Sequence, residues 1–242
     1  MSRTAAIVPA AGRGERLGPG APKALRTVGG VPMLVHAVRA LATARGVDLV
    51  VVAAPPDGVE QVRTLLASHA LDEPAVGRSA AAVVVAGGDT RQASVAAALA
   101  SLPDDVDVVL VHDAARPLAP ESLVCSVVAA VRAGSPAVVP GVSVTDTVKR
   151  VGATGVVVET LDRTVLRSVQ TPQGFARSVL AAAHAAADPA TSATDDAGLV
   201  EASGVTVSVI AGDEEAFKVT RPIDLVLAEA VLARRRAAGV VG

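Results

Sequence analysis

Small residues and two cations follow the first apolar run of the sequence. The run ends at Pro9 and continues into Ala-Ala-Gly-Arg-Gly-Glu-Arg-Leu over residues 10–17, and Lys23 comes shortly afterwards. Small side chains let backbone N–H groups approach an oligophosphate closely, while Arg16 and Lys23 add positive charge beside its oxygens. A glycine-rich turn without a ligand would not need two spaced cations, so the segment is typical of phosphate binding.

A dinucleotide-binding turn is the obvious competitor for this segment. Its third glycine would fall on Leu17, and the next apolar run ends Ala-Ala-Pro-Pro over residues 53–56, with no acid for a ribose hydroxyl. The Gly-Lys-Ser/Thr sequence of a Walker loop is also missing. These gaps favour a triphosphate over a dinucleotide.

A second polar group follows another apolar run, in the sequence Val-His-Asp-Ala-Ala-Arg-Pro over residues 111–117. Ligands of open α/β sheets bind outside the carboxyl ends of the strands. Asp113 is suited to hold Mg²⁺ through one carboxylate while phosphate oxygens and water complete the octahedron, and Arg116 can contact a second anion. On these residues alone, an aspartate that caps the next helix remains an equal alternative. His112 is interpreted as a buried structural residue.

Further polar residues occur where the core pattern does not ask for them. Gly87-Gly88-Asp89 and Ser94 follow the third run and can read a base or ribose, although a plain loop with Asp89 as helix N-cap stays open. The pattern Thr-Asp-Asp over 194–196 favours helix capping when taken alone. Lys218 precedes the final helix, where the helix dipole disfavours a cation, and is therefore the more suggestive residue.

Short apolar runs alternate with longer helical patterns along the chain. Strands are expected over 5–9, 48–54, 82–86, 106–112, 137–140 and 206–210, and helices over 32–44, 58–70, 90–102, 120–133, 176–187 and 222–236. Continuous apolar strands bounded by helices indicate a Rossmann-like, mostly parallel sheet with helices on both faces. We expect a single α/β domain over residues 1–242.

One stretch, at about 142–169, breaks this alternation. Polar and apolar residues alternate over 143–151 and 156–160, with glycines between them, which predicts a projecting β-hairpin arm. A two-stranded ribbon is marginal by itself, so a second copy of the chain is the natural partner and a homodimer is expected.

The composition of the chain limits the kinds of partner that we expect. The net charge is −2, which argues against a nucleic acid or a membrane as the main partner. The single cysteine, Cys125, excludes an internal disulfide and is consistent with a reducing cytoplasm. Four histidines without ligand spacing argue against a zinc site.

Taken together, these motifs resemble the 2-C-methyl-D-erythritol 4-phosphate cytidylyltransferase family. The resemblance rests on segments 9–17, 22–23, 87–89, 111–117, 146–147, 162–163, 171–173, 194–196 and 218–222, which occur in the family's order. It implies that CTP and methylerythritol 4-phosphate, with Mg²⁺, give the cytidine diphosphate derivative and pyrophosphate. Asp196 stands where many relatives have glutamate.

The resemblance also implies a role for each matching residue. The nucleotide would contact Pro9, Ala10, Ala11, Gly12, Gly14, Gly87, Gly88, Asp89, Ser94 and Ala114. The catalytic residues would be Arg16, Lys23, Arg163 and Lys218, and the metal ligand would be Asp113. The acceptor would contact Asp113, Arg116, Thr147, Arg163, Thr171, Thr194 and Lys218, with Thr147 and Arg163 reaching it across a dimer. Three alternatives stay open, namely a cytidylyltransferase for another polyol phosphate such as ribitol 5-phosphate, a non-catalytic nucleotide sensor and a dinucleotide oxidoreductase.

Overall fold

The computed structural model describes residues 2–11, 22–73, 80–187 and 194–239. Its centre is one eight-stranded sheet in the order β10-β7-β11-β6-β1-β4-β5, with β12 paired to β7. The strands are β1 (Arg3–Pro9), β4 (Leu49–Ala54), β5 (Ala81–Ala86), β6 (Val106–Val111), β7 (Ala137–Ser143), β10 (Arg167–Val169), β11 (Gln173–Ala176) and β12 (Ser208–Ala211). Strands β6, β1, β4 and β5 run parallel to one another, as the sequence predicts.

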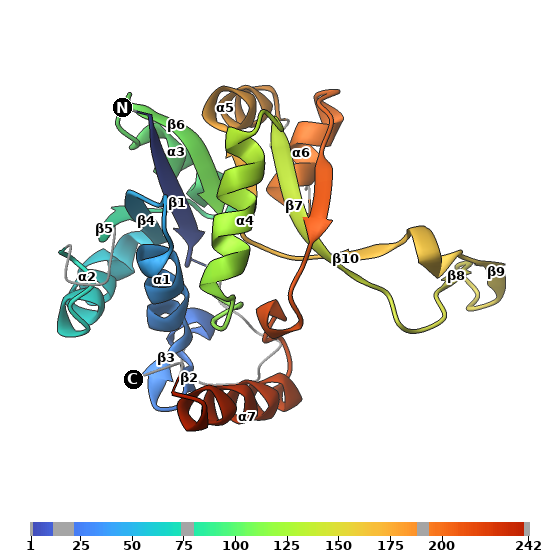
Figure 1. The fold of residues 1–242 in the computed structure, drawn as a ribbon. Coiled ribbons are helices and arrows are strands. Elements are labelled where there is room, and N and C mark those ends of the chain that lie inside the picture. The colour runs from blue at the N-terminus through green and yellow to red at the C-terminus, as the bar shows by residue number, and fades with distance from the viewer. Residues whose placement is uncertain (1, 12–21, 74–79, 188–193, 240–242) are drawn as a thin grey trace.

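Helices cover both faces of this sheet (Figure 1). They are α1 (Met33–Thr43), α2 (Val59–Ser68), α3 (Arg91–Ala100), α4 (Glu121–Arg132), α5 (Arg177–Ala186), α6 (Asp196–Ala202) and α7 (Pro222–Ala237). Apolar residues of α1, α2 and α4 pack together on one face, and those of α3, α5 and α6 pack on the other. The predicted α/β class with helices on both faces is therefore confirmed.

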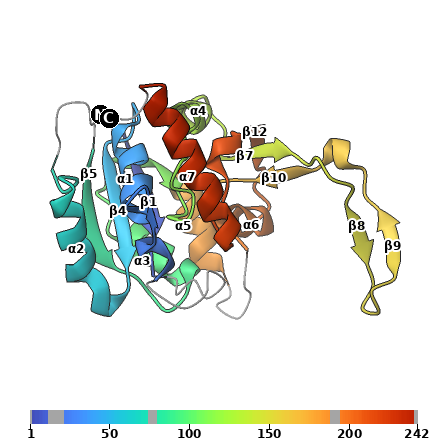
Figure 2. The ribbon, with the colours of Figure 1, turned by 90° about the horizontal axis from the view of Figure 1, so that it is seen from below.

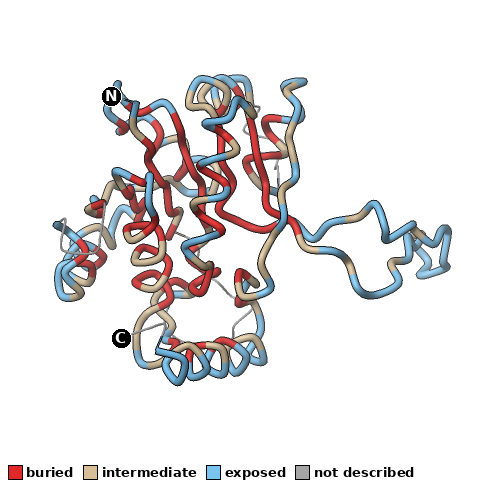
Figure 3. The backbone as a smooth tube through the Cα atoms, in the orientation of Figure 1, coloured by how far each residue is buried: buried red, intermediate tan, exposed pale blue. Residues whose placement is uncertain are grey.

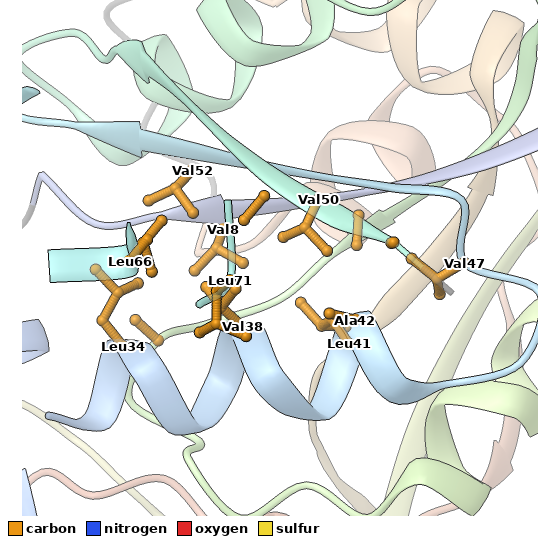
Figure 4. Packing of buried hydrophobic residues seen from close by; sticks show 14 of the residues in the cluster. Val8, Leu34, Val38, Leu41, Ala42, Val47, Val50, Val52, Leu66 and Leu71 are labelled. Carbon is orange, nitrogen blue, oxygen red and sulfur yellow. The ribbon is translucent and has the colours of Figure 1, made fainter. Parts of the chain in front are cut away.

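Alternation along each strand divides the core between the two faces. In β1, Ala6 and Val8 belong to the cluster with α1, whereas Ala5 and Ile7 belong to the cluster with α3. Successive strand side chains point to opposite faces, so a continuously apolar strand fills both cores. Figure 4 shows Val8 of the sheet facing the buried side chains of α1. Figure 3 shows that the central strands consist largely of buried residues, whereas exposed residues recur along the helices.

Helix α7 lies outside these two layers and crosses the molecule beneath the sheet (Figure 2). Its buried face, formed by Ala228 and Leu232, packs on Val28, Met33 and Leu118. Val28 ends the short strand β2 (Thr27–Val28), which pairs with β3 (Val31–Pro32). No helix in the ranges described above is long and apolar enough to cross a membrane.

The hairpin arm projects away from the sheet, as Figures 1 and 2 show. It contains β8 (Lys149–Val151), β9 (Val157–Thr160) and the short helix η4 (Arg163–Val165), and its valines are largely exposed. The prediction of a hairpin is confirmed, but its first strand is shorter than expected. Ser143 instead ends β7, where it pairs with Arg167 of β10.

Two antiparallel strands depart from the expected strand–helix alternation. Strand β11 pairs antiparallel with both β6 and β7, and β10 pairs antiparallel with the end of β7. The chain thus returns from the arm directly into the sheet. This return brings Thr171, just before β11, beside the carboxyl end of β6, where Asp113 lies.

Candidate active site

A cavity of about 240 Å³ opens at the carboxyl ends of β1, β5 and β6. It is lined by Pro9, Ala10, Ala11, Lys23, Ala24, Asp89, Thr90, Arg91, Ser94, Asp113, Ala114, Ala115 and Lys218. Three separate predicted motifs therefore meet at one edge of the sheet, because parallel strands end on the same side. Gly12, Gly14 and Arg16 lie outside the described residues.

The Gly87-Gly88 loop borders this cavity and is held by Ser94. The Ser94 hydroxyl accepts a hydrogen bond from Gly88 N at 3.1 Å and lies 2.9 Å from Thr90 O. A Cβ on Gly88 would lie 2.6 Å from Ala93 Cβ, and one on Gly87 would lie 2.8 Å from Ser94 Oγ. The paired glycines are therefore required by the close approach of this loop to the start of α3.

The N-cap of α3 is not the residue named in the alternative that the sequence left open. Thr90, and not Asp89, occupies this position, and its hydroxyl accepts a hydrogen bond from Ala93 N at 3.0 Å. A threonine hydroxyl satisfies one of the unpaired N–H groups of the first turn, which leaves Asp89 without that task. Asp89 is exposed and lines the cavity.

Asp113 lies at the centre of the charged groups. Its Oδ1 atom is 3.4 Å from Arg91 Nε, its Oδ2 atom is 2.6 Å from Lys218 Nζ, and its backbone N–H donates to Thr171 Oγ1 at 3.0 Å. Burial alone would raise the pKa of this carboxyl, but Arg91 and Lys218 bring it well below its ordinary value. Asp113 is therefore ionised at neutral pH.

A second cavity, of about 160 Å³, lies on the other side of these charges. It is lined by Arg91, Asp113, Arg116, Val169, Gln170, Thr171, Gln173, Thr194, Asp195 and Lys218. Arg91, Asp113 and Lys218 line both cavities and form the boundary between them. The predicted acceptor residues Arg116, Thr171 and Thr194 all belong to the second cavity.

Arg116 is more engaged with its own chain than the sequence suggested. It is buried, and its two terminal nitrogens donate to Ala216 O at 2.7 Å and Val169 O at 3.2 Å. Only its Nε atom, also buried, makes no hydrogen bond to the described part of the chain. Most of this guanidinium therefore links Val169, at the base of the arm, to Ala216, which shortly precedes Lys218.

His112 is fully buried beneath the site, as expected of a structural residue. Its Nδ1 atom is 3.1 Å from Thr171 Oγ1, and its Nε2 atom is 3.2 Å from Arg116 O. Burial lowers the pKa of His112 to about 4, and the nearby Asp113 only partly offsets this effect. A neutral imidazole with both nitrogens engaged stabilises the strand end and does not accept a proton from a ligand.

Two predicted acceptor residues are not brought to the cavities of their own chain. Thr147 and Arg163 are exposed on the arm, and neither lines either cavity. Arg163 donates to Thr145 O within the arm. Any contact of these residues with a site must therefore be made in another copy of the chain or after a change in the arm.

Two residues, Arg91 and Gln173, were given no role from the sequence. Arg91 bridges Asp113 and Asp196, and Gln173 donates to Asp195 Oδ2 at 2.7 Å while accepting from Ala197 N at 3.2 Å. Arg91 carried a signal, because it is a cation in the first turn of α3, where the helix dipole disfavours it. Lys218 lies four residues before Pro222, outside the first turn of α7, and its charge is accounted for by Asp113.

The side chains of the first cavity bear on whether it can hold a divalent cation. Within the described ranges, no three His, Cys, Asp or Glu side chains group together as a metal site. Mg²⁺ is commonly held by one or two carboxylates together with substrate phosphates and water. The ionised carboxylate of Asp113, at the edge of a cavity lined by small residues and Lys23, fits that mode of binding.

A mostly parallel α/β sheet whose strand ends place small residues, a glycine pair and an ion-paired aspartate around one cavity is the arrangement expected of a nucleotidyltransferase. The family model of 2-C-methyl-D-erythritol 4-phosphate cytidylyltransferase (IspD) matches residues 4–234. The chain belongs to this family, whose members act in the non-mevalonate pathway to isoprenoid precursors.

Individual relatives agree with this assignment. The 2-C-methyl-D-erythritol 4-phosphate cytidylyltransferase of Streptomyces coelicolor is 58% identical over 241 residues, which cover 97% of this chain and 87% of that protein. The crystal structure of the enzyme of that name from Thermus thermophilus is 39% identical and has a TM-score of 0.74, covering 97% of this chain and 100% of the other. The synthase structure from Anaerococcus prevotii, at 26% identity, has a TM-score of 0.80 and covers 96% of this chain and 99% of the other.

Proposed function

We propose that the two cavities divide the two substrates of cytidylyl transfer between them. CTP occupies the first cavity, beside Pro9, Ala10 and the Gly87-Gly88 loop, and methylerythritol phosphate occupies the second, beside Thr171 and Thr194. The observation that carries this proposal is the shared boundary of the cavities, because the α-phosphorus and the acceptor phosphate must meet. Arg91, Asp113 and Lys218 line both sides of that boundary.

Two anionic phosphates must approach each other there, so the chemistry requires local positive charge. Lys23 lines the first cavity and Lys218 lines both, although the chain as a whole carries a net charge of −2. The acceptor phosphate is already ionised and attacks in line, so positioning and electrostatic stabilisation supply catalysis without a general base. Lys23, Lys218 and Arg16 are assigned to the charge that develops on the phosphate oxygens.

Mg²⁺ is proposed as the cofactor, held by Asp113 together with triphosphate oxygens. When bound, it would supply further positive charge to the phosphate oxygens and the leaving pyrophosphate. Asp113 itself orients Lys218, since its Oδ2 atom is 2.6 Å from the ammonium nitrogen. Thr171 in turn fixes the backbone of Asp113 through its hydroxyl, at 3.0 Å from the backbone nitrogen.

A homodimer formed through the arm is also proposed. The exposed valines of the arm, which include Val151 at 56% and Val165 at 75% exposure, need an apolar partner. Thr147 and Arg163 lie on the same arm and would reach the second cavity of the partner chain. In this arrangement, Arg163 of one chain would add a cation to the acceptor site of the other chain.

Pyrophosphate release tests the division of substrates. We expect release with CTP and methylerythritol phosphate, and much weaker release when UTP, ATP or GTP replaces CTP or ribitol 5-phosphate replaces the acceptor. Thr194→Val should raise the KM for the acceptor and leave the KM for CTP within about twofold, because Thr194 lines only the second cavity. An unchanged KM for the acceptor would contradict its placement in that cavity.

Subunit mixing tests the arm. An Arg163→Ala chain and a Lys23→Ala chain should each be impaired alone and should recover part of the activity when mixed. Recovery is expected because one of the two sites in a mixed dimer then contains both intact residues. Subunit exchange should be followed independently with a labelled chain. No recovery despite demonstrated exchange would contradict a shared site.

A further inference from the structure

Asp196, at the first position of α6, is buried and charged although it lines neither cavity. Its side chain is 1% exposed. Burial alone would raise the pKa of this carboxyl, but the hydrogen bond from His184 and the charge of Arg91 lower it. A buried ion pair is costly to desolvate and often adds little to stability, so a purely structural role explains this carboxylate poorly.

Arg91 connects Asp196 to the boundary between the cavities. Its Nη1 atom lies 2.6 Å from Asp196 Oδ2, whereas its Nε atom lies 3.4 Å from Asp113 Oδ1. The shorter of the two contacts is the one with Asp196, away from the boundary between the cavities. Because a planar guanidinium has a fixed arrangement of donors, holding one of its edges fixes the direction of the other.

His184 supports Asp196 from the opposite side. Its Nε2 atom lies 2.9 Å from Asp196 Oδ1, and its side chain is 4% exposed. The two oxygens of Asp196 are thus divided between an imidazole and a guanidinium. The result is a chain of contacts that runs from α5 through α6 and α3 to Asp113, at the strand end.

The two cations on Asp113 differ in how they are held. Arg91 is held from behind by Asp196, whereas Lys218 is 39% exposed and forms its ion pair with Asp113. We propose that Asp196 and His184 are positioning residues that fix Arg91 on Asp113, which allows Lys218 to turn from Asp113 to the acceptor phosphate. Asp113 then stays paired when its second cation leaves, so the movement does not expose an uncompensated carboxylate.

This inference depends on the proposed assignment of the acceptor to the second cavity. The test compares Asp196→Asn with Asp48→Asn in steady-state kinetics and thermal unfolding. Asp48→Asn makes the same chemical change at the opposite end of the strands, where the Asp48 carboxylate accepts a hydrogen bond from Thr4 N at 2.8 Å. We expect Asp196→Asn to lower kcat/KM for methylerythritol phosphate on the order of tenfold or more, because misplaced reacting groups are that costly. Asp48→Asn should leave kcat/KM within about twofold.

A double-mutant cycle separates positioning from general destabilisation. If Asp196 acts through Asp113, then adding Asp196→Asn to Asp113→Asn should change kcat/KM by less than about twofold, because the chain of contacts is already interrupted. Equal losses in both backgrounds would overturn the proposal. Asp196→Glu, which keeps the charge, should retain more activity than Asp196→Asn, and the reverse order would also overturn it.

A milder variant covers the case in which Asp196→Asn does not fold. His184→Leu removes the imidazole but puts an apolar side chain in its place, and it should show a smaller loss of kcat/KM for methylerythritol phosphate. A folded His184→Leu protein with unchanged kinetics would overturn the inference. A wild-type protein inactive with CTP and methylerythritol phosphate would instead overturn the proposed substrates, so the two failures are distinct.

Discussion

Gly88→Ala offers a direct test of the proposed contact between the Gly87-Gly88 loop and CTP, because the structure gives the distances from a new Cβ to its neighbours. The new Cβ would lie 2.6 Å from Ala93 Cβ and 3.3 Å from the carbonyl carbon of Ala93. Gly88 does not have a left-handed backbone conformation, so alanine adds no strain of that kind. The cost is therefore a steric clash between the loop and the start of α3.

The size and location of this cost follow from the packing. Inserting a methyl group into a tight contact costs about 1–3 kcal/mol. Helix α3 is anchored by Val95 and Ala98, both fully buried, whereas Gly88 lies in a half-buried loop. The loop should therefore move and α3 should not. We expect the KM for CTP to rise at least about tenfold, equivalent to about 1.4 kcal/mol, with the acceptor KM nearly unchanged.

Three control variants make this test specific. Gly88→Ala combined with Ala93→Gly removes the 2.6 Å contact and should restore most of the affinity for CTP, whereas Ala93→Gly alone should cost only about 1 kcal/mol of helix stability. A Cβ on Gly58 would meet no atom closer than 3.5 Å, so Gly58→Ala should leave the KM for CTP unchanged. Wild-type KM in Gly88→Ala would refute a close approach of this loop to the nucleotide. A double mutant as impaired as the single would refute the steric explanation.

Three further results are expected. Lys23→Ala should lower kcat at least about 100-fold, and near-full turnover would remove Lys23 from the catalytic set. Removal of divalent ions with EDTA should abolish turnover until Mg²⁺ is added, and metal-independent turnover would exclude the proposed cofactor. The pKa of buried His112 is about 4 and that of an unfolded histidine is near 6.5, so the unfolded chain takes up the proton first on acidification. The free energy of unfolding should therefore fall between about pH 6.5 and about pH 4, and this residue should contribute up to about 3 kcal/mol of that fall. Urea unfolding of His112→Gln should show a shallower fall over the same pH range. An equal fall would contradict a buried, neutral His112.

The parallel part of the fold was predictable because each of its strands has a strong local signal. Runs such as residues 49–54, Leu-Val-Val-Val-Ala-Ala, are apolar on both faces and have no other stable location than the middle of a sheet. The place of Asp113 followed from the same logic, since it is the second residue after the end of β6. Local pattern and topology therefore located the first cavity.

The parts that were not predicted depend on distant partners. Strand β11 contains a glycine and a buried glutamine, and its place between β6 and β7 is stabilised by Gln173, whose side chain binds Asp195 and Ala197 N more than 20 residues later. A Cβ on Gly174 would lie 2.5 Å from Val127 of α4, so this glycine is explained by packing that the local sequence does not reveal. The role of Arg91 depends on Asp196, which follows it by 105 positions. The hydrophobic periodicity of a short stretch of sequence carries no information about such pairings between distant residues.

The charges at the boundary favour the proposed catalysis by positioning and electrostatic stabilisation. Asp113 and Asp196 have pKa values below the ordinary range, and the pKa of Arg91 is raised, since Asp196 and Asp113 together outweigh the effect of its burial. These three groups therefore keep a single charge state throughout the neutral range. Turnover should accordingly show no ionisation of Asp113 or Asp196 near neutral pH, which agrees with catalysis by fixed charges. In the proposed arrangement, Asp113 holds Arg91 and Lys218 close together at the boundary where the two phosphates would meet.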